Sequence, residues 1–430
     1  MTNLYAGGAA EPDDRSSRPR AVLPALCATQ ITSWGIVYYA FPVLNSRITA
    51  DTGWSTSATT GAFSMALLVS AVTGIPIGRA LDRRGPHKVM TFGSALAVVS
   101  VVAIAAAPNL AVFYAAWFLA GIAMAATFYQ PAFAAVTRWW GPQRVRALTV
   151  ITLAGGLAST VFAPITAALA DHFTWRTTYA VLAVLLALIT IPAHALALRA
   201  PWPPAPEPSV HSGAENSSDT VARTRPLLLL AAAFTLSGFA VYAVVIGLVP
   251  LLTERGASAT TAAWALGLGG AGQTLGRSLY ASLARRTTTA TRTVLLITAG
   301  GATTLALGLV PGPIPLLVVL AVAAGMVRGN LTLLQATAVT DRWGATHYGT
   351  LSGLLAAPAT VAAAIAPWAG ASLAETLGGY PALFAGLSLA SLAAALLAWG
   401  SSVTVPSKEP GSQAKVKASE YGAPTRDVGR

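Results

Sequence analysis

Long apolar stretches alternate with short polar ones along almost the whole chain. A helix needs roughly 20 apolar residues to cross a hydrocarbon layer about 30 Å thick, and about twelve stretches meet that requirement. The pattern therefore predicts an all-α membrane protein with twelve transmembrane helices. The predicted spans are 21–45, 56–80, 88–107, 110–136, 145–170, 176–198, 227–252, 260–284, 292–311, 314–340, 347–374 and 379–400.

Composition supports this assignment. Of the 430 residues, 54% are hydrophobic and only 10% are charged, a balance too apolar for a soluble globular protein. The first apolar stretch is too long for a signal peptide and lacks a small-residue cleavage site, so we predict a retained helix. Cys27 is the single cysteine, which excludes a disulfide framework and a thiolate metal site.

The net charge of +12 reports topology rather than nucleic-acid binding, because the basic residues lie in short loops instead of one patch. With the N-terminus inside, fourteen lysines and arginines of the loops face the cytoplasm, and only Arg47, Arg176 and Arg255 face outward. Both termini are therefore predicted to be cytoplasmic. The alanine- and arginine-rich composition suggests a GC-rich bacterium, whose plasma (inner) membrane is the expected location.

The polar segments divide the chain into parts. We predict an N-terminal tail at 1–20, a six-helix bundle at 21–198, a flexible linker at 199–226, a second six-helix bundle at 227–400 and a C-terminal tail at 401–430. The two bundles share residues at a constant offset of 203: Gly78 with Ala281, Trp140-Gly141 with Trp343-Gly344, and Ala163-Pro164 with Ala366-Pro367. This weak repeat predicts an internal duplication, which is typical of secondary transporters whose substrate site lies between the repeats.

The loop after the second predicted helix reads "GRALDRRGPHK". Here the sequence resembles the major facilitator superfamily, whose signature in this loop is G-x-x-x-D-R-x-G followed by basic residues. Gly78, Asp82, Arg83, Gly85 and Lys88 fit the signature, whereas Pro86 and His87 depart from it. The resemblance implies a cytoplasmic latch, made with Asp82 and Arg83, that stabilises an outward-open state. Arg285 stands where Asp82 would repeat, so only the N-terminal half is expected to latch strongly.

Two branches of that family are candidates. The stretches "WGIVYYAFPVL" and "DTGWSTSATTGAFSMALLVS" resemble the monocarboxylate and oxalate:formate porters. In that group an acidic residue or asparagine often precedes an arginine of the eighth helix by four positions, but here the pair is Gln273 and Arg277. Drug:proton antiporters carry a glycine pattern in the fifth helix, where this chain has Ala163-Pro164 and Ala167-Ala168 instead.

A charge lies deep in the tenth predicted span. Arg328 is 13 residues from both Pro315 and Asp341. At about 1.5 Å per residue this is roughly 20 Å from each end, too far for easy snorkelling. An arginine at the centre of a helix costs about 2.5–3.5 kcal/mol on insertion scales, so it needs a partner. All fifteen acidic residues fall in loops, tails or helix ends. The partner must then be water, backbone carbonyls, polar side chains such as Asn330 or Gln335, or an anionic ligand.

We therefore predict a transporter of a small, monocarboxylate-like organic anion, which works by alternating access around Arg328 and Arg277. The alternatives are a multidrug or natural-product exporter and, from another class, a non-transporting sensor. No enzyme motif, cofactor site or metal site is present, and we expect a monomer. Uniport, anion exchange and proton-coupled symport all stay open. The other candidate cavity residues are Gln273, Tyr38, Tyr39, Tyr129, Gln130, Tyr242 and Asn330, and the candidate bending points are Pro131, Pro164, Pro358 and Pro367.

Overall fold

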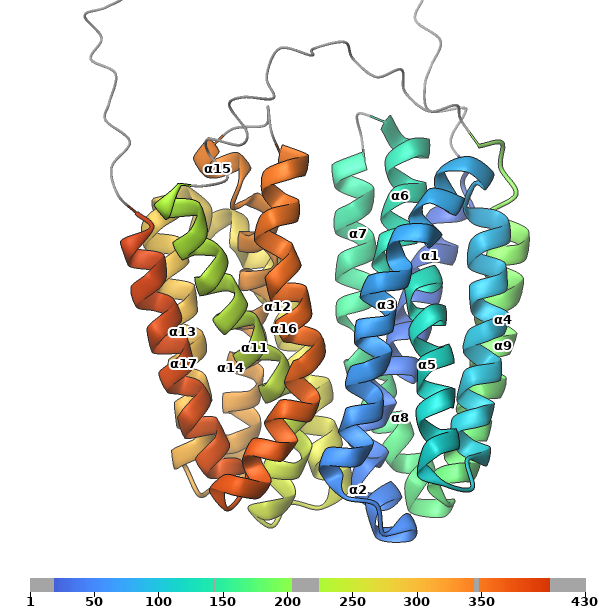
Figure 1. Cartoon of the computed structure of the whole chain (residues 1–430), viewed down its shortest axis with the longest axis horizontal. Coiled ribbons are helices and arrows are strands. Elements are labelled where there is room, and N and C mark those ends of the chain that lie inside the picture. The colour runs from blue at the N-terminus through green and yellow to red at the C-terminus, as the bar shows by residue number, and fades with distance from the viewer. Residues whose placement is uncertain (1–18, 142–143, 203–223, 344–347, 403–430) are drawn as a thin grey trace, which may run out of the picture.

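The computed structural model describes residues 19–141, 144–202, 224–343 and 348–402, and within these ranges the regular elements are all helical. Two bundles of helices stand side by side (Figure 1). The N-bundle consists of α1 (Val22–Ser33), η1 (Trp34–Tyr39), α2 (Ala40–Thr52), α3 (Thr56–Arg84), α4 (Pro86–Ala106), α5 (Leu110–Thr127), α6 (Tyr129–Trp140), α7 (Arg144–Gly156), α8 (Ala158–His172) and α9 (Trp175–Ala197).

The C-bundle follows the linker and is coloured green to red in Figure 1. Its helices have fewer interruptions than those of the N-bundle. They are α11 (Arg225–Glu254), α12 (Ala259–Arg286), α13 (Thr289–Leu309), α14 (Ile314–Thr337), α15 (Thr340–Trp343), α16 (Tyr348–Leu377) and α17 (Tyr380–Gly400).

Twelve spans result from these helices. Among the described residues, ten helical segments are long and apolar enough to cross a membrane by themselves. The other two spans are α1–η1–α2, which a π-helix interrupts, and α12, which is rich in glycine and threonine. The predicted fold class, two six-helix bundles, is confirmed. The first span runs farther than its predicted end at residue 45, because the polar residues beyond it stay helical until Gly53 stops the helix at a φ of 73°.

Several spans are broken at the level of the bundle centre. The π-helix η1 lies just before Pro42, and α5 ends at Thr127, four residues before Pro131. Because proline has no N–H, Pro131 cannot donate to the Thr127 carbonyl four residues earlier. The side-chain amide of Gln30 donates to that carbonyl instead, at 2.7 Å. Of the predicted bending points, Pro131 adjoins a break, whereas Pro164, Pro358 and Pro367 lie inside helices α8 and α16 that continue through them.

The two bundles meet near one end of the molecule. We call the side on which α9 ends and α11 begins the linker face, and the other side the distal face (Figure 1). Near the distal face, the Thr260 hydroxyl of the C-bundle donates to the Asp171 carboxylate of the N-bundle at 2.6 Å. The Ser57 backbone N–H donates to the Glu375 carboxylate at 3.0 Å. These contacts close the distal end.

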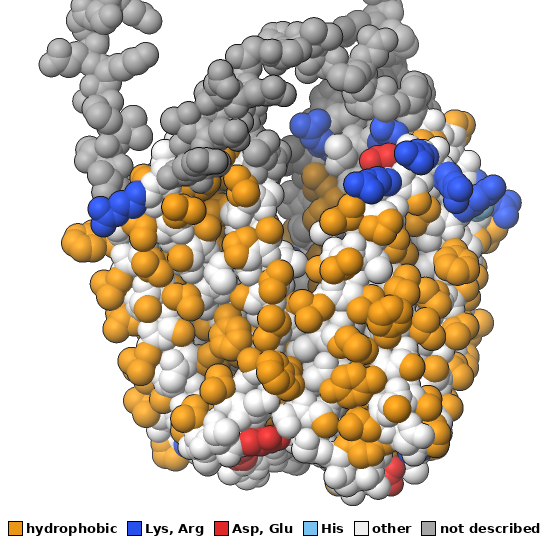
Figure 2. Space-filling view, in the orientation of Figure 1, with side chains coloured by type: hydrophobic (Ala, Val, Ile, Leu, Met, Phe, Trp, Pro, Cys, Tyr) orange, Lys and Arg blue, Asp and Glu red, His pale blue; other side chains and the backbone are white. Residues whose placement is uncertain are grey.

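Two further hydrogen bonds extend this closure toward the centre. The Trp368 N–H donates to the Ser64 hydroxyl at 3.0 Å, and the Thr160 hydroxyl donates to the Gly267 carbonyl at 2.8 Å. The surface between the bundles is hollowed toward the linker face, near which blue lysine and arginine side chains gather (Figure 2). The structure is therefore closed at the distal face and open toward the linker face.

Candidate functional site

A cavity of about 190 Å³ lies between the two bundles. We call it the arginine compartment, because Arg277 and Arg328 both line it. The N-bundle contributes residues of η1, α6 and α7 to its wall, and the C-bundle contributes residues of α11, α12 and α14. Seven of the nine predicted cavity residues line this compartment: Tyr38, Tyr39, Tyr129, Tyr242, Gln273, Arg277 and Arg328.

A glycine-lined crossing of α12 and α14 brings the arginines of these two helices together. A Cβ atom on Gly276 would collide with the Met326 carbonyl, and one on Gly329 would collide with the Gln273 carbonyl. The backbones of the two helices therefore lie in direct contact, as small residues allow in membrane helix packing. In the stretch "GLGGAGQTLGR", Gly269, Gly272 and Gly276 face α14 at this crossing, whereas Gly267 and Gly270 face α8 of the N-bundle.

Arg328 is met by a neutral partner. Its Nε donates to the side-chain oxygen of Gln273 at 3.0 Å. Its Nη2 atom is buried and has no hydrogen-bond partner in the structure. A buried donor without an acceptor costs free energy, and more when the group is charged. Arg328 thus has a neutral side-chain partner and a buried donor that is not used.

Arg277 has a similar environment. Only 8% of the residue is exposed, and its Nη1 donates across the bundle interface to the Thr152 carbonyl of α7. Its Nε is buried and has no hydrogen-bond partner in the structure. Gln273, one helical turn before Arg277, is equally buried, at 8% exposed. Two guanidinium groups with unused donors therefore line one compartment.

An adjoining cavity of about 280 Å³ continues into the N-bundle side of the interface. We call it the aromatic compartment. It shares Trp34, Tyr38, Tyr129 and Tyr242 with the arginine compartment. The ring of Trp34 stacks on Phe128 with 4.1 Å between the centroids. The remaining lining residues are Leu67, Ser70, Ala71, Met124, Ala125, Gln130, Pro131, Thr360, Ala363 and Ala364.

The charged side chains that line the two compartments are all positive. None of the described residues that line the two compartments is an aspartate or a glutamate. The guanidinium groups of Arg277 and Arg328 are thus the only charged groups in this lining, which gives the cavity a positive potential. His194 does not line it, because its ring is held inside the N-bundle by the hydroxyls of Ser94 at 2.7 Å and Thr29 at 3.0 Å.

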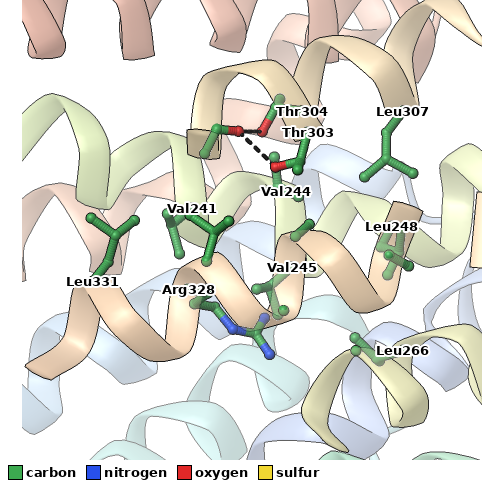
Figure 3. Close-up of a pocket in the computed structure, with 16 residues that line it drawn as sticks. Val241, Val244, Val245, Leu248, Leu266, Thr303, Thr304, Leu307, Arg328 and Leu331 are labelled. Atoms are coloured by element: carbon green, nitrogen blue, oxygen red, sulfur yellow. Dashed lines mark hydrogen bonds between the residues drawn. The ribbon is translucent and has the colours of Figure 1, made fainter. Parts of the chain in front are cut away.

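A smaller pocket inside the C-bundle adjoins the arginine compartment (Figure 3). Its volume is about 40 Å³, and aliphatic side chains such as Val241, Leu307 and Leu331 dominate its lining. Arg328 is the charged member of that lining. The pocket's Thr303 and Thr304 hydroxyls both donate to the Gly300 carbonyl. No acidic side chain is among the described residues that line this pocket, so it offers Arg328 no ion-pair partner.

The other two predicted cavity residues lie elsewhere. Gln130 lines the aromatic compartment and is exposed. Asn330 does not line either compartment, because it points to another face of α14, where its side-chain amide donates to the Met326 carbonyl at 2.9 Å. Of the polar side chains considered as partners of Arg328, Asn330 is therefore excluded and Gln335 lines the same compartment, while the hydrogen bond is made by Gln273.

Sequence reasoning missed several lining residues. Trp34 and Ser237 were not among the predicted cavity residues, nor was Thr332. Helical spacing could have indicated Thr332, because residues 331, 332 and 335 follow Arg328 at intervals of three, four and seven and share its face of the helix. Trp34 lies in the π-helix η1, which no hydropathy pattern indicates. Such π-helical turns are frequent at functional sites.

The family profile described as Major Facilitator Superfamily matches residues 26–314 and 228–427, which together span most of the chain. The protein belongs to the major facilitator superfamily of transporters. No curated protein sequence matches the chain.

Solved structures of major facilitator transporters share the fold. A mutant of the nucleoside transporter NupG has a TM-score of 0.74 and 12% sequence identity, covering 88% of this chain and 98% of that one. A bacterial homolog of the human lysosomal transporter Spinster, inward-facing and unoccupied, has a TM-score of 0.71 and 16% identity, covering 91% and 98%. The same homolog in an inward-facing, occupied conformation has a TM-score of 0.70 and 14% identity, covering 92% and 98%. At these identities the likeness shows the fold alone.

The major facilitator signature loop lies at the linker face, between α3 and α4. Gly85 turns the chain there with a φ of 75°. The backbone carbonyl of Asp82 accepts hydrogen bonds from the Trp202 indole at 3.2 Å and from Arg138 at 3.5 Å. The side chains of Asp82 and Arg83 are exposed, as is that of Lys88, and Gly78 is half-buried. Their role as a latch stays a prediction.

Proposed function

We propose that this transporter moves an organic anion across a bacterial plasma membrane by alternating access, with a single chain as the working unit. The observation that supports the proposal most directly is the pair Arg277 and Arg328, which line one cavity and keep buried donors unused. Guanidinium groups bind carboxylates through paired N–H donors, and such charge-assisted hydrogen bonds are among the strongest in proteins. A lipophilic cation would be repelled from this compartment.

The topology of the proposal follows from the positive-inside rule. Loops at the linker face hold most of the lysines and arginines, so we assign this face to the cytoplasm. The closed distal face then lies outside, and the hollow toward the linker face corresponds to an inward-open state (Figure 2). In the opposite state, rocking of the bundles would open the distal contacts and bring the signature loop against the C-bundle.

We propose that no carboxylate of the protein carries a coupling proton in the cavity, because none of the described lining residues is acidic. Transport would then be uniport, anion exchange, or symport with the proton on the substrate's own carboxyl group. Flux into proteoliposomes with and without a pH gradient separates these modes.

The test of the function is Arg328→Gln. Loss of hydrogen bonds from a charged donor costs about 1.5–3 kcal/mol, so we expect anion binding to weaken roughly ten- to hundredfold. Binding is measured as the ligand-induced rise in melting temperature of the purified protein, and transport as flux in proteoliposomes. Arg285→Gln is the matched control, since it removes the same charge from an exposed position at the linker-face end of α12. Wild-type anion transport by the Arg328 variant would rule out the proposed role.

A second candidate function is drug or natural-product export. The aromatic compartment favours it, because its described lining residues carry no charge and it is larger than the arginine compartment. Export of this kind should survive loss of both arginines. Drug protection of cells expressing the double variant Arg277→Gln/Arg328→Gln would therefore support the exporter and count against the anion transporter.

A further inference from the structure

The two compartments adjoin and share lining residues, but they differ in chemistry. The arginine compartment is lined by guanidinium and amide groups on the C-bundle side. The aromatic compartment is lined by rings, by Leu67 and Met124, and by small residues, and no charged side chain is among its described lining residues. Four aromatic residues line both compartments and mark where the two adjoin. A bound molecule that fills both must therefore have one charged end and one apolar end.

The charged end offers unused donors that suit one anionic group. The buried Nη2 of Arg328 and the buried Nε of Arg277 are donors without acceptors. Other donors of these side chains are already used inside the protein, with Gln273 and with the Thr152 carbonyl. One carboxylate between the arginines would satisfy the unused donors. A second charge on the ligand would have to enter the aromatic compartment, where burial without a partner is costly.

The apolar end has room for a ring system. An apolar cavity of about 150 Å³ is large enough to bind benzene. The aromatic compartment has a volume of about 280 Å³, so it can hold a larger, bicyclic ring. Trp34, Phe128 and Tyr242 line it, and aromatic side chains can pack with another ring in offset or edge-to-face geometry.

We propose that the preferred substrate is an aromatic monocarboxylate, with its carboxylate against Arg328 and Arg277 and its ring in the aromatic compartment. This inference rests on the proposed function and makes it more specific. Small acids such as acetate leave the aromatic compartment filled with water, and dicarboxylates bring a second charge into it. Both are expected to bind more weakly than an aromatic monocarboxylate.

A series of ligands tests this selectivity. Acetate, benzoate, indole-3-acetate, terephthalate and the uncharged benzamide are compared by ligand-induced change in melting temperature of the full-length protein. We expect indole-3-acetate and benzoate to bind roughly tenfold or more tightly than acetate, because burial of a ring adds to the affinity of the carboxylate. Benzamide and terephthalate should bind more weakly than benzoate. Acetate binding as tightly as benzoate, or terephthalate binding more tightly, would overturn the inference.

A matched pair of variants tests the position of the ring. Ala71 lines the aromatic compartment, whereas its neighbour Val72 is 69% exposed on the outer face of α3. Ala71→Phe fills the compartment and should weaken indole-3-acetate binding at least tenfold while leaving acetate binding unchanged. Val72→Phe adds a ring to the same helix and should change neither. Equal affinity for indole-3-acetate in both variants would show that the ring binds elsewhere.

Failure of the two proposals can be distinguished. If none of the anions binds, or if Arg328→Gln binds them all like wild type, the proposed function fails and the substrate class fails with it. If anions bind through Arg328 but show no preference for a ring, only the aromatic substrate class is overturned.

Discussion

The substitution Gln273→Glu changes the charge of the cavity with the smallest change in shape. The new carboxylate would take the place of the amide oxygen that accepts from Arg328 Nε at 3.0 Å. A ligand carboxylate on the same guanidinium would lie about 5 Å away, where two like charges repel by about 3 kcal/mol at an effective dielectric constant of 20. Anion affinity should therefore fall roughly a hundredfold, since each 1.4 kcal/mol is a factor of about ten.

The assay is titration of the purified variant with benzoate, followed by melting temperature. Two controls separate charge from other effects. Gln273→Met removes the acceptor without adding a charge and should weaken binding much less. Asn109→Asp adds the same charge at the N-cap of α5, where the side chain accepts from the Val112 N–H and an aspartate caps equally well. If a folded Gln273→Glu protein keeps wild-type affinity, the anion does not bind beside Arg328.

The remaining predictions concern packing and conformation. Gly329→Val forces α14 away from the Gln273 carbonyl and should destabilise the protein by about 1–3 kcal/mol, measured by unfolding in detergent. Gly386→Ala is the control, because an added Cβ there meets no atom within 4 Å, and it should leave stability unchanged or slightly raised. Glu375→Gln weakens the acceptor of the Ser57 N–H and should shift spin-label distances across the distal face toward opening. Asp82→Asn removes the predicted latch charge and should shift the same distances toward closure. Unchanged distances would contradict the distal contact in the Glu375 variant and the predicted latch in the Asp82 variant.

Much of the fold could be predicted from the sequence, because a lipid environment makes hydropathy a direct signal. Each span has to satisfy its backbone internally, so twelve apolar stretches require twelve helices. The predicted limits of α4 and α9 agree with the structure to within two residues. The end of α2 was missed because its last residues are polar, and a polar helix outside the membrane leaves no hydropathy signal.

The local breaks could not be predicted in the same way. Pro131 indicated a break in the fourth span, but the structure adds the Gln30 side chain that satisfies the freed Thr127 carbonyl. Gln30 comes from α1, 97 positions away in the sequence. A partner that far along the chain is chosen by packing, which a single sequence does not display.

From the sequence alone, Arg328 can be placed deep in a membrane helix, with no acidic residue at the same depth. The energetic cost of such a charge is a property of the residue and its position, so it can be read without coordinates. Only the tertiary structure decided which group meets it. The glycine crossing of α12 and α14 sets Gln273 beside Arg328 and turns Asn330 away, and the meeting of the two bundles joins the arginines to an aromatic compartment. These outcomes depend on which helix faces touch, and that is fixed by the packing of the whole chain.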